Sequence, residues 1–221
     1  MRLTESGYNP WFVNQVVNIM GLEKLLDAIA EQGWYVWDDF LTPDQVSRLR
    51  SCAPESWQQA RIGRQDEAQR ISQIRSDKIQ WLRESMGQPI QDYLERMEQI
   101  RQQVNQDFFL GLFEYEAHFA KYEAGDLYKK HLDAFRGNEN RKLTTVFYMN
   151  PNWRAADGGE LKLYDLNDQL IETIAPISGR LVVFLSEKFP HEVLPTQAER
   201  ISIAGWFRTN GVTENRLDIA R

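Results

Sequence analysis

One stretch of sequence organises the second half of the chain: Tyr128-Lys129-Lys130-His131-Leu132-Asp133. Side chains of an extended strand alternate between its two faces, so a strand here projects His131 and Asp133 from the same face. A histidine and an aspartate two residues apart also occur together by chance. The meaning of the pair therefore depends on the strands around it and on residues further along the chain.

Around this stretch the period of the apolar residues changes from about 3.6, typical of helices, to 2, typical of strands. We expect strands at residues 113–122, 128–133, 143–149, 160–164, 169–174, 180–185, 191–194 and 201–207. Turn-forming runs such as Asp157-Gly158-Gly159 separate them. Helices followed by about eight short strands predict an α+β fold, with a double-stranded β-helix (jelly roll) core and N-terminal supporting helices.

The first half of the chain carries the helical signals. Apolar residues from Leu22 to Ile29 have helical spacing, and Thr42-Pro43-Asp44-Gln45 has the residue types of a helix start with a capping box. Apolar positions from Ile90 to Val104 predict a long amphipathic helix. Between them, residues 58–77 are polar, and residues 74–82 form a short strand candidate. The polar run is either a solvated excursion or a functional loop.

Composition excludes several classes of protein. The chain has 221 residues, 42% of them hydrophobic, which is enough for a globular core. The net charge of -6 argues against a DNA-binding protein, and we expect no membrane partner because no apolar run approaches the length of a membrane span. Cys52 is the only cysteine, so the chain has no thiolate metal cage. We expect a cytoplasmic location, where thiols stay reduced.

A distant histidine completes a metal-binding pattern. His191 follows Asp133 by some sixty residues and opens a late strand. Two histidines and one carboxylate in this order are typical of the facial triad that holds Fe(II) and leaves its other side open. The third histidine, His118, also lies in a strand, and its default interpretation is a packed or surface residue.

Arg200 indicates what the open side of such a metal would bind. It begins an apolar strand, and a buried guanidinium needs an anion. That anion is either a protein carboxylate or the distal carboxylate of a dicarboxylate cosubstrate, which the planar fork of arginine fits. Tyr148 lies in another apolar strand and either assists Arg200 or belongs to the core. A 2-oxoacid takes two metal positions and O2 takes one, so the pattern favours a 2-oxoglutarate-dependent oxygenase.

Four segments of the sequence resemble one family. They are Gln73-Ile74-Arg75-Ser76-Asp77-Lys78-Ile79-Gln80-Trp81, the stretch from Tyr128 to Asp133, Gly158-Gly159-Glu160-Leu161, and Pro190-His191-Glu192-Val193 continuing through Arg200 to Trp206. They are similar to prolyl hydroxylases, in particular the hypoxia-inducible-factor prolyl hydroxylases and their bacterial relatives. The run Arg-x-Asp-Lys-Ile-x-Trp is the most specific part, because other oxygenases of the superfamily lack it.

The resemblance implies roles for individual residues. His131, Asp133 and His191 would bind iron, and Arg200, Tyr148 and Tyr122 would bind the 2-oxoglutarate. Residues of the substrate site would be Arg75, Asp77, Trp81, Tyr128, Arg141 and Trp206. Three places depart from the animal enzymes: the run Ala134-Phe135-Arg136 differs from their Asn-Pro-like run, His118 stands where they carry methionine, and Ala204 replaces a threonine.

The resemblance also implies the reaction and the organisation of the chain. We expect hydroxylation of a prolyl residue, at C4, in a protein substrate, with elongation factor Tu as the best candidate. The cofactors would be Fe(II), 2-oxoglutarate and O2, with ascorbate as a reductant. Residues 1–19 would be a disordered N-terminal extension, 20–110 a support region with a mobile substrate loop near 58–77, 111–210 the dioxygenase core, and 211–221 a C-terminal tail.

Three alternatives remain open on sequence grounds. One is a hydroxylase of a free amino acid or another small molecule, which needs no peptide groove. A second is a nucleic-acid dealkylase of the same superfamily, which the acidic charge disfavours. A third is a jelly-roll binding module with a degenerate site, which the complete set of ligands and Arg200 disfavours.

Overall fold

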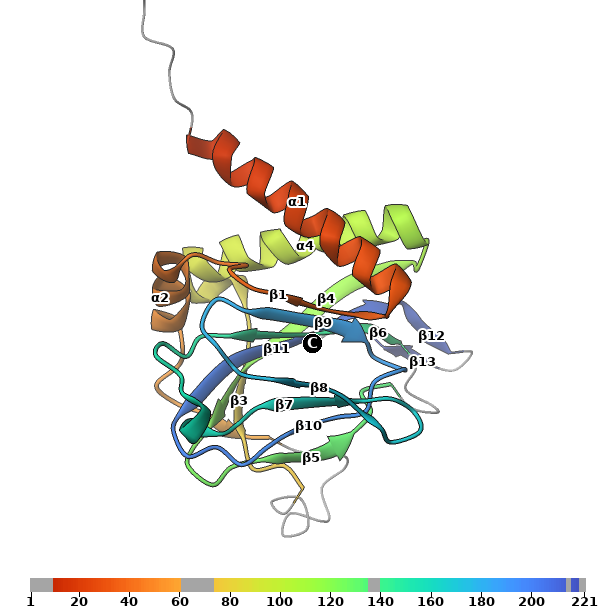
Figure 1. The fold of residues 1–221 in the computed structure, drawn as a ribbon. Helices are drawn as coiled ribbons and strands as arrows, with labels where there is room; N and C mark the ends of the chain where they lie inside the picture. Colours follow the sequence, from red (N-terminus) through yellow and green to blue (C-terminus); the bar gives the residue numbers. More distant parts are fainter. Residues whose placement is uncertain (1–9, 61–73, 135–139, 214–215, 219–221) are drawn as a thin grey trace, which may run out of the picture.

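Three α-helices lie on one side of a pair of β-sheets in the described part of the chain (Figure 1). The computed structural model describes residues 10–60, 74–134, 140–213 and 216–218. The helices are α1 (Pro10–Glu31), α2 (Pro43–Ser51) and α4 (Gln88–Phe108), with two short 3-10 turns, η1 (Glu84–Met86) and η2 (Ala155–Asp157). No helix among these residues is both long and apolar enough to cross a membrane.

Two antiparallel sheets face each other below the helices. The larger sheet has the order β1 (Trp34–Trp37), β9 (Leu181–Leu185), β6 (Arg141–Tyr148), β11 (Arg200–Thr209), β4 (Leu112–Tyr122), β3 (Lys78–Trp81) and β2 (Gln58–Gln59). The smaller sheet has the order β5 (Tyr128–His131), β10 (His191–Val193), β7 (Leu161–Tyr164) and β8 (Leu170–Ile174). Strands distant in sequence thus become neighbours, and the arrangement confirms the predicted jelly roll with supporting helices.

Alternation along the strands of the larger sheet produces two separate cores. Phe147 and Val183 face the helices and pack with Ile90 and Met97 of α4. Their neighbours face the smaller sheet, where Val146, Val182 and Phe184 pack with Leu163. A strand buried on both faces reads as a continuous apolar run, as Leu181–Leu185 does.

The helix signals of the sequence are present in the structure. The Thr42 side chain accepts a hydrogen bond from the Gln45 amide, and the Gln45 side chain accepts one from the Thr42 amide, as a capping box requires. Helix α1 begins at Pro10, earlier than the helical spacing after residue 20 indicated. Residues 1–9 of the expected extension lie outside the described residues. Where a tail was expected, β12 (Gly211–Thr213) pairs with β13 (Arg216–Asp218).

Two predicted strand boundaries need correction. Strand β5 ends at His131, so Asp133 lies in a bend after the strand rather than within it. In the polar stretch, Gln58–Gln59 pairs with β3, although no strand was expected there. Residues 61–73, the middle of the expected loop, lie outside the described part of the chain.

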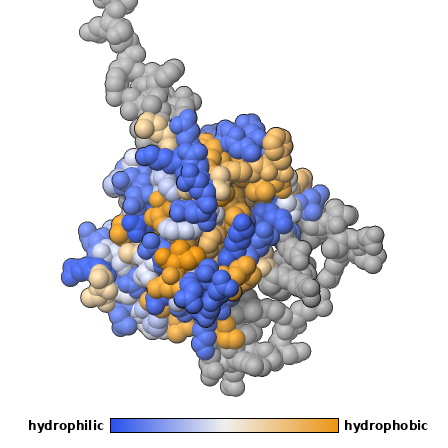
Figure 2. Space-filling model, turned by 45° about the vertical axis from the view of Figure 1, so that its right-hand side comes forward, coloured by the Kyte–Doolittle hydropathy of each residue, from blue (hydrophilic) through white to orange (hydrophobic). Residues whose placement is uncertain are grey.

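The surface mixes polar and apolar side chains, as is normal for globular proteins. On the face drawn in Figure 2, hydrophobic residues lie between hydrophilic ones. The most exposed large apolar side chains among the described residues are Phe109, Leu166, Phe113, Met20 and Leu170.

We predict that Gly205→Ala destabilises the larger sheet. A Cβ at residue 205 would lie 2.2 Å from the Tyr115 hydroxyl oxygen and 2.9 Å from the Ala117 Cβ. That hydroxyl is held 2.8 Å from Thr145 Oγ1, so it has little freedom to move away. We expect a loss of about 1–3 kcal/mol in the free energy of unfolding, measured by urea denaturation. An unchanged urea midpoint would contradict the tight packing of Tyr115 on this strand.

Candidate active site

A pocket lies between the two sheets, with an empty volume of about 560 Å³ that includes its open mouth. Both sheets contribute to its walls. The described residues that line it are Arg75, Asp77, His118, Ala120, Tyr122, Tyr128, His131, Asp133, Arg141, Thr144, Val146, Leu161, His191, Val193, Arg200, Ser202, Ala204 and Trp206.

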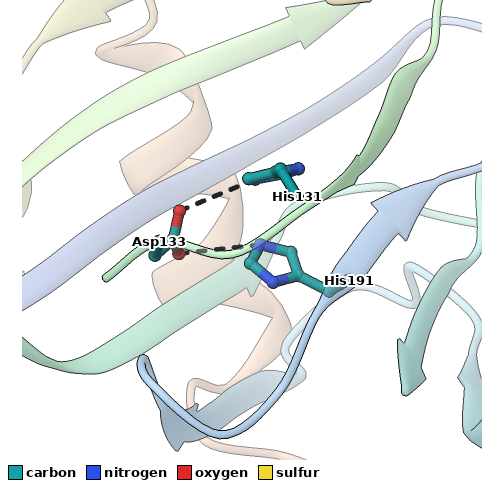
Figure 3. Close-up of side chains that lie close together, drawn as sticks. All are labelled: His131, Asp133 and His191. Atoms are coloured by element: carbon teal, nitrogen blue, oxygen red, sulfur yellow. Dashed lines mark ion pairs between the residues drawn. The ribbon is translucent and has the colours of Figure 1, made fainter. Parts of the chain in front are cut away.

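The structure brings His131, Asp133 and His191 together in this pocket (Figure 3). The Nε2 atom of His131 lies 3.6 Å from Oδ1 of Asp133, and that of His191 lies 3.6 Å from Oδ2. His131 is also the direct cross-strand partner of His191 in the β5–β10 ladder. One donor atom from each residue lies within 4.8 Å of the others, so the three side chains surround a common point.

The backbone orients both imidazoles. Nδ1 of His131 lies 2.8 Å from the Lys129 carbonyl oxygen, and Nδ1 of His191 lies 3.1 Å from that of Phe189. A carbonyl only accepts, so each Nδ1 carries a hydrogen, and in the neutral form of the ring Nε2 is the atom that keeps a lone pair. A second-shell hydrogen bond of this kind fixes the tautomer of metal-binding histidines.

Donors from the larger sheet hold the carboxylate of Asp133. Its Oδ2 accepts hydrogen bonds from Thr144 Oγ1 at 2.8 Å and from Trp206 Nε1 at 2.9 Å. Ser186 Oγ lies 2.9 Å from the same Thr144 hydroxyl. Burial alone would raise the pKa of Asp133, but His191, His131 and the Trp206 donor outweigh it and hold the pKa well below its usual range. Burial and the neighbouring His131 lower the pKa of His191 to about 4, so at neutral pH its ring is uncharged.

These donors suit a divalent metal ion with open positions. Two neutral imidazoles and one ionised carboxylate are the ligands of non-haem Fe(II). For metal–ligand bonds of about 2.1 Å at right angles, neighbouring donor atoms lie about 3 Å apart; here each imidazole Nε2 lies 3.6 Å from a carboxylate oxygen, so small side-chain shifts would complete the site. The three residues predicted as ligands therefore form a site that fits the metal.

Arg200 is buried, with 1% of its surface exposed. Its Nε donates to the Gly159 carbonyl at 2.9 Å and its Nη1 to Ser202 Oγ at 3.2 Å. Its Nη2 and the hydroxyl of Tyr148 have no hydrogen-bond partner among the described residues. No ion pair joins Arg200 to a carboxylate in this part of the chain. The sequence left two partners open for Arg200, a protein carboxylate or an external anion. The lack of a protein carboxylate beside it among these residues favours the external anion.

Aromatic rings enclose the Arg200 guanidinium. Its central carbon lies 4.8 Å from the Tyr122 ring centre and 5.1 Å from that of Tyr148. Tyr148 itself is fully buried and is not among the residues that line the pocket. Burial raises the pKa of both hydroxyls above their usual value, with Arg200 opposing the shift. Both tyrosines are therefore neutral hydrogen-bond donors at any physiological pH.

The end of the polar stretch is tied to the metal site by a line of contacts. Arg75 makes a bidentate ion pair with the fully buried Asp77, at 2.6 and 2.9 Å. The Arg75 guanidinium lies 4.7 Å from the Tyr128 ring centre. Tyr128 stacks on the ring of His131 with their centres 3.7 Å apart. The Arg75–Asp77 pair, predicted for substrate binding, is thus linked through Tyr128 to the predicted metal ligand His131.

Arg141 and Trp206 form a second part of the predicted substrate site. Arg141 pairs with Glu116 at 2.9 Å and lies 3.7 Å from the Trp206 ring centre. Trp81, predicted beside them, does not line the pocket. It lies on β3 with 38% of its surface exposed and contacts His118 instead.

Sequence reasoning missed several residues of the pocket, and two of them, His118 and Thr144, contact other parts of the site. His118 was interpreted as a packed or surface residue, yet it lines the pocket and is almost fully buried. Its strand offered a signal, because residues 118 and 120 share the face of Tyr122 by the period of two. Thr144 carried no comparable signal, since its contact with Asp133 joins two segments that meet only in the fold.

We predict that Trp206→Phe weakens metal binding. The change keeps an aromatic ring beside Arg141 but removes the donor to Asp133 Oδ2. Loss of such a second-shell contact typically costs about 10–100-fold in metal affinity. Titration with Mn(II), followed by electron paramagnetic resonance, measures this. Trp81→Phe is the matched control, because that ring has no contact with Asp133. Equal Mn(II) affinity in Trp206→Phe and the control would contradict the role of the indole.

Comparison with known proteins agrees with this geometry. Residues 117–208 match the family model described as the 2OG-Fe(II) oxygenase superfamily. The hypoxia-inducible factor prolyl hydroxylase of Caenorhabditis elegans is 30% identical over an alignment of 212 positions, which covers 88% of this chain. The chain spans only 29% of that relative's length, and 35% of the prolyl hydroxylase EGLN3 of Mus musculus.

Solved structures extend the likeness to the whole described fold. A prolyl-4-hydroxylase of Pseudomonas putida superposes with a TM-score of 0.76 and 38% identity, covering 86% of this chain and 100% of that one. A prolyl hydroxylase from Trichoplax adhaerens, in complex with a peptide fragment of the hypoxia inducible factor oxygen degradation domain, gives a TM-score of 0.75 and 25% identity over 91% and 94%. The triad, the buried arginine and these relatives show that the chain belongs to the prolyl hydroxylases of the 2OG-Fe(II) oxygenase superfamily.

Proposed function

We propose that this protein is an Fe(II)- and 2-oxoglutarate-dependent dioxygenase that hydroxylates a prolyl residue, at C4, in another protein. In the balanced reaction, 2-oxoglutarate loses CO2 and takes up one oxygen atom of O2 to become succinate. The other oxygen atom is inserted into a C–H bond of the prolyl ring and becomes its hydroxyl group. A bound iron would supply the chemistry by which O2 oxidises the substrate, because a three-ligand site leaves positions for both the 2-oxoacid and O2.

One observation carries the proposal: the triad shares its pocket with a buried guanidinium that has an unused donor. Arg200 Nη2 and the Tyr148 hydroxyl both lack partners among the described residues. Leaving such groups unsatisfied in a buried site is costly. The distal carboxylate of 2-oxoglutarate would satisfy both, while the 2-oxoacid end reaches the metal. No monocarboxylate offers two such groups at opposite ends.

The residues of the chain would position the reactants and exclude water. Arg200 and Tyr148 would anchor the cosubstrate at one end. Thr144 and Trp206 hold Asp133 in one orientation, and the backbone holds both imidazoles. The aromatic rings of Tyr122, Tyr128 and Trp206 would shield the reacting centre from solvent.

The prolyl substrate is supported by the aromatic lining and by the likeness to prolyl hydroxylases. A pyrrolidine ring is apolar and flat enough to lie against Tyr128 and Trp206. Arg75 and Asp77 would order the end of the substrate loop near these rings. A peptide rather than a free amino acid is favoured because the structural relative from Trichoplax adhaerens holds a peptide fragment.

The identity of the partner rests on the sequence resemblance. Elongation factor Tu is our candidate protein, and ascorbate our candidate reductant. We place the reaction in the cytoplasm, which suits a chain whose single cysteine, Cys52, is unpaired.

We predict that Arg200→Lys raises the KM for 2-oxoglutarate at least tenfold. A lysine keeps one positive charge but cannot make the two parallel hydrogen bonds of a guanidinium. Succinate formation at varied 2-oxoglutarate concentration measures this. Arg101→Lys is the matched control, because Arg101 pairs with Glu98 of the same helix and does not line the pocket. An unchanged KM for Arg200→Lys would rule out its cosubstrate role.

We predict that the purified protein adds 16 Da to a proline of elongation factor Tu when Fe(II), 2-oxoglutarate and O2 are present. Mass spectrometry with fragmentation locates the site, and NMR of the hydrolysed residue distinguishes C4 from C3. His131→Ala should abolish both the modification and succinate formation. Turnover of free proline, with no protein modified, would support the small-molecule alternative instead. Full activity of His131→Ala would refute the triad.

A further inference from the structure

His118 occupies the centre of the pocket wall that faces the predicted substrate residues. In β4 it lies directly across from Trp81 of β3 on one side and from Ala204 of β11 on the other. It lines the pocket, and only 1% of its surface is exposed. Neither the metal triad nor the Arg200 site uses this side chain. A buried imidazole that no assigned site uses suggests a further binding role.

Neighbouring rings fix the orientation of the imidazole. Its centre lies 5.2 Å from the Trp81 ring in an edge arrangement and 5.5 Å from the Trp206 ring. Its Nδ1 lies 3.0 Å from the Phe119 carbonyl oxygen. That carbonyl is an acceptor, so Nδ1 carries the hydrogen. The ring is thus held at one edge by the backbone of its own strand and on both sides by indoles.

The other ring nitrogen is a free acceptor. Burial, with the positive charges of Arg75 and Arg141, lowers the pKa of His118 to about 4, against opposing effects of Asp77 and the Phe119 carbonyl. The ring is therefore neutral at physiological pH, and Nε2 keeps its lone pair. Nε2 has no hydrogen-bond partner in the described part of the chain, and it is not among the side-chain atoms sealed from solvent.

The chemistry of the pocket restricts what this acceptor binds. 2-Oxoglutarate presents only oxygen acceptors, which a lone pair repels, and O2 has no hydrogen to donate. Water can donate to this nitrogen in the substrate-free pocket, and of the reactants only the substrate carries a donor that could replace that water. The target proline has no N–H within a chain, so the nearest donors on a bound peptide are the backbone N–H groups of its neighbours.

We propose that His118 is a specificity-determining residue whose Nε2 accepts a hydrogen bond from the backbone N–H of a residue next to the target proline. The inference rests on the proposed prolyl hydroxylase function and extends it to the peptide flank. It implies that the enzyme reads the peptide backbone beside the prolyl ring. A substrate with no N–H at that neighbour, such as one with two consecutive prolines, would be disfavoured.

The test uses a library of blocked peptides that carry one central proline. The best substrate of the wild-type protein is resynthesised with N-methyl groups on the residue before or after the proline. We expect one of these N-methyl peptides to have a KM about tenfold higher for the wild type, the size of one neutral hydrogen bond, with kcat less affected.

Two variants assign the effect to His118. His118→Phe keeps an aromatic ring between Trp81 and Trp206 without an acceptor, so it should bind the unmodified peptide about tenfold more weakly and gain nothing further from N-methylation. His118→Gln offers an amide oxygen near the position of Nε2 and should restore the preference. Steric effects of the methyl group act on all three proteins, so the difference between them isolates the hydrogen bond.

Each outcome has a defined meaning. If the KM of the wild type is the same for both N-methyl peptides as for the unmodified peptide, the inference is wrong. This measurement uses only the wild-type protein, so it does not depend on whether a variant folds. Equal discrimination by His118→Phe and the wild type would also overturn it. If the wild type modifies no peptide in the library, the proposed function itself fails, and the inference fails with it.

Discussion

The buried carboxylate of Asp133 is the interaction on which the site depends. It follows a strand of the smaller sheet, yet its hydrogen-bond donors, Thr144 and Trp206, come from the larger one. An ionised carboxylate in a buried position needs such donors, because desolvation of an unpaired charge costs several kcal/mol. The carboxylate therefore joins the two sheets and aims at the point between His131 and His191 at the same time.

Arg200 poses the opposite problem, a buried cation whose donors are only partly used. Hydrogen bonds to Gly159 and Ser202 hold the guanidinium, and Tyr122 and Tyr148 enclose it. Replacing a buried charge of this kind by an apolar side chain is often neutral or stabilising. A contribution to stability therefore does not explain why an arginine is buried here. Binding of an anionic ligand that completes its hydrogen bonds does explain it.

The substrate side of the pocket is coupled to the metal side through packed rings. The Asp77–Arg75 pair contacts Tyr128, which stacks on His131, while Arg141 stacks on Trp206, which donates to Asp133. Two of the three predicted ligands therefore touch residues that we propose bind the substrate. A substrate that orders one of these contacts also steadies a metal ligand, which is a direct physical route between substrate binding and the metal site.

The sequence by itself determined the jelly roll, the start of α2 and three ligand-type residues, because strand alternation and helix capping are local properties that neighbouring residues encode. It also located Arg200 at the start of a buried strand. Only the tertiary structure decided that Asp133 lies in a bend beyond β5, that Trp206 donates to it, and that Trp81 lies beside His118 on the neighbouring strand without lining the pocket. These relations join strands far apart in sequence, and the register between such strands is set by packing across the two sheets.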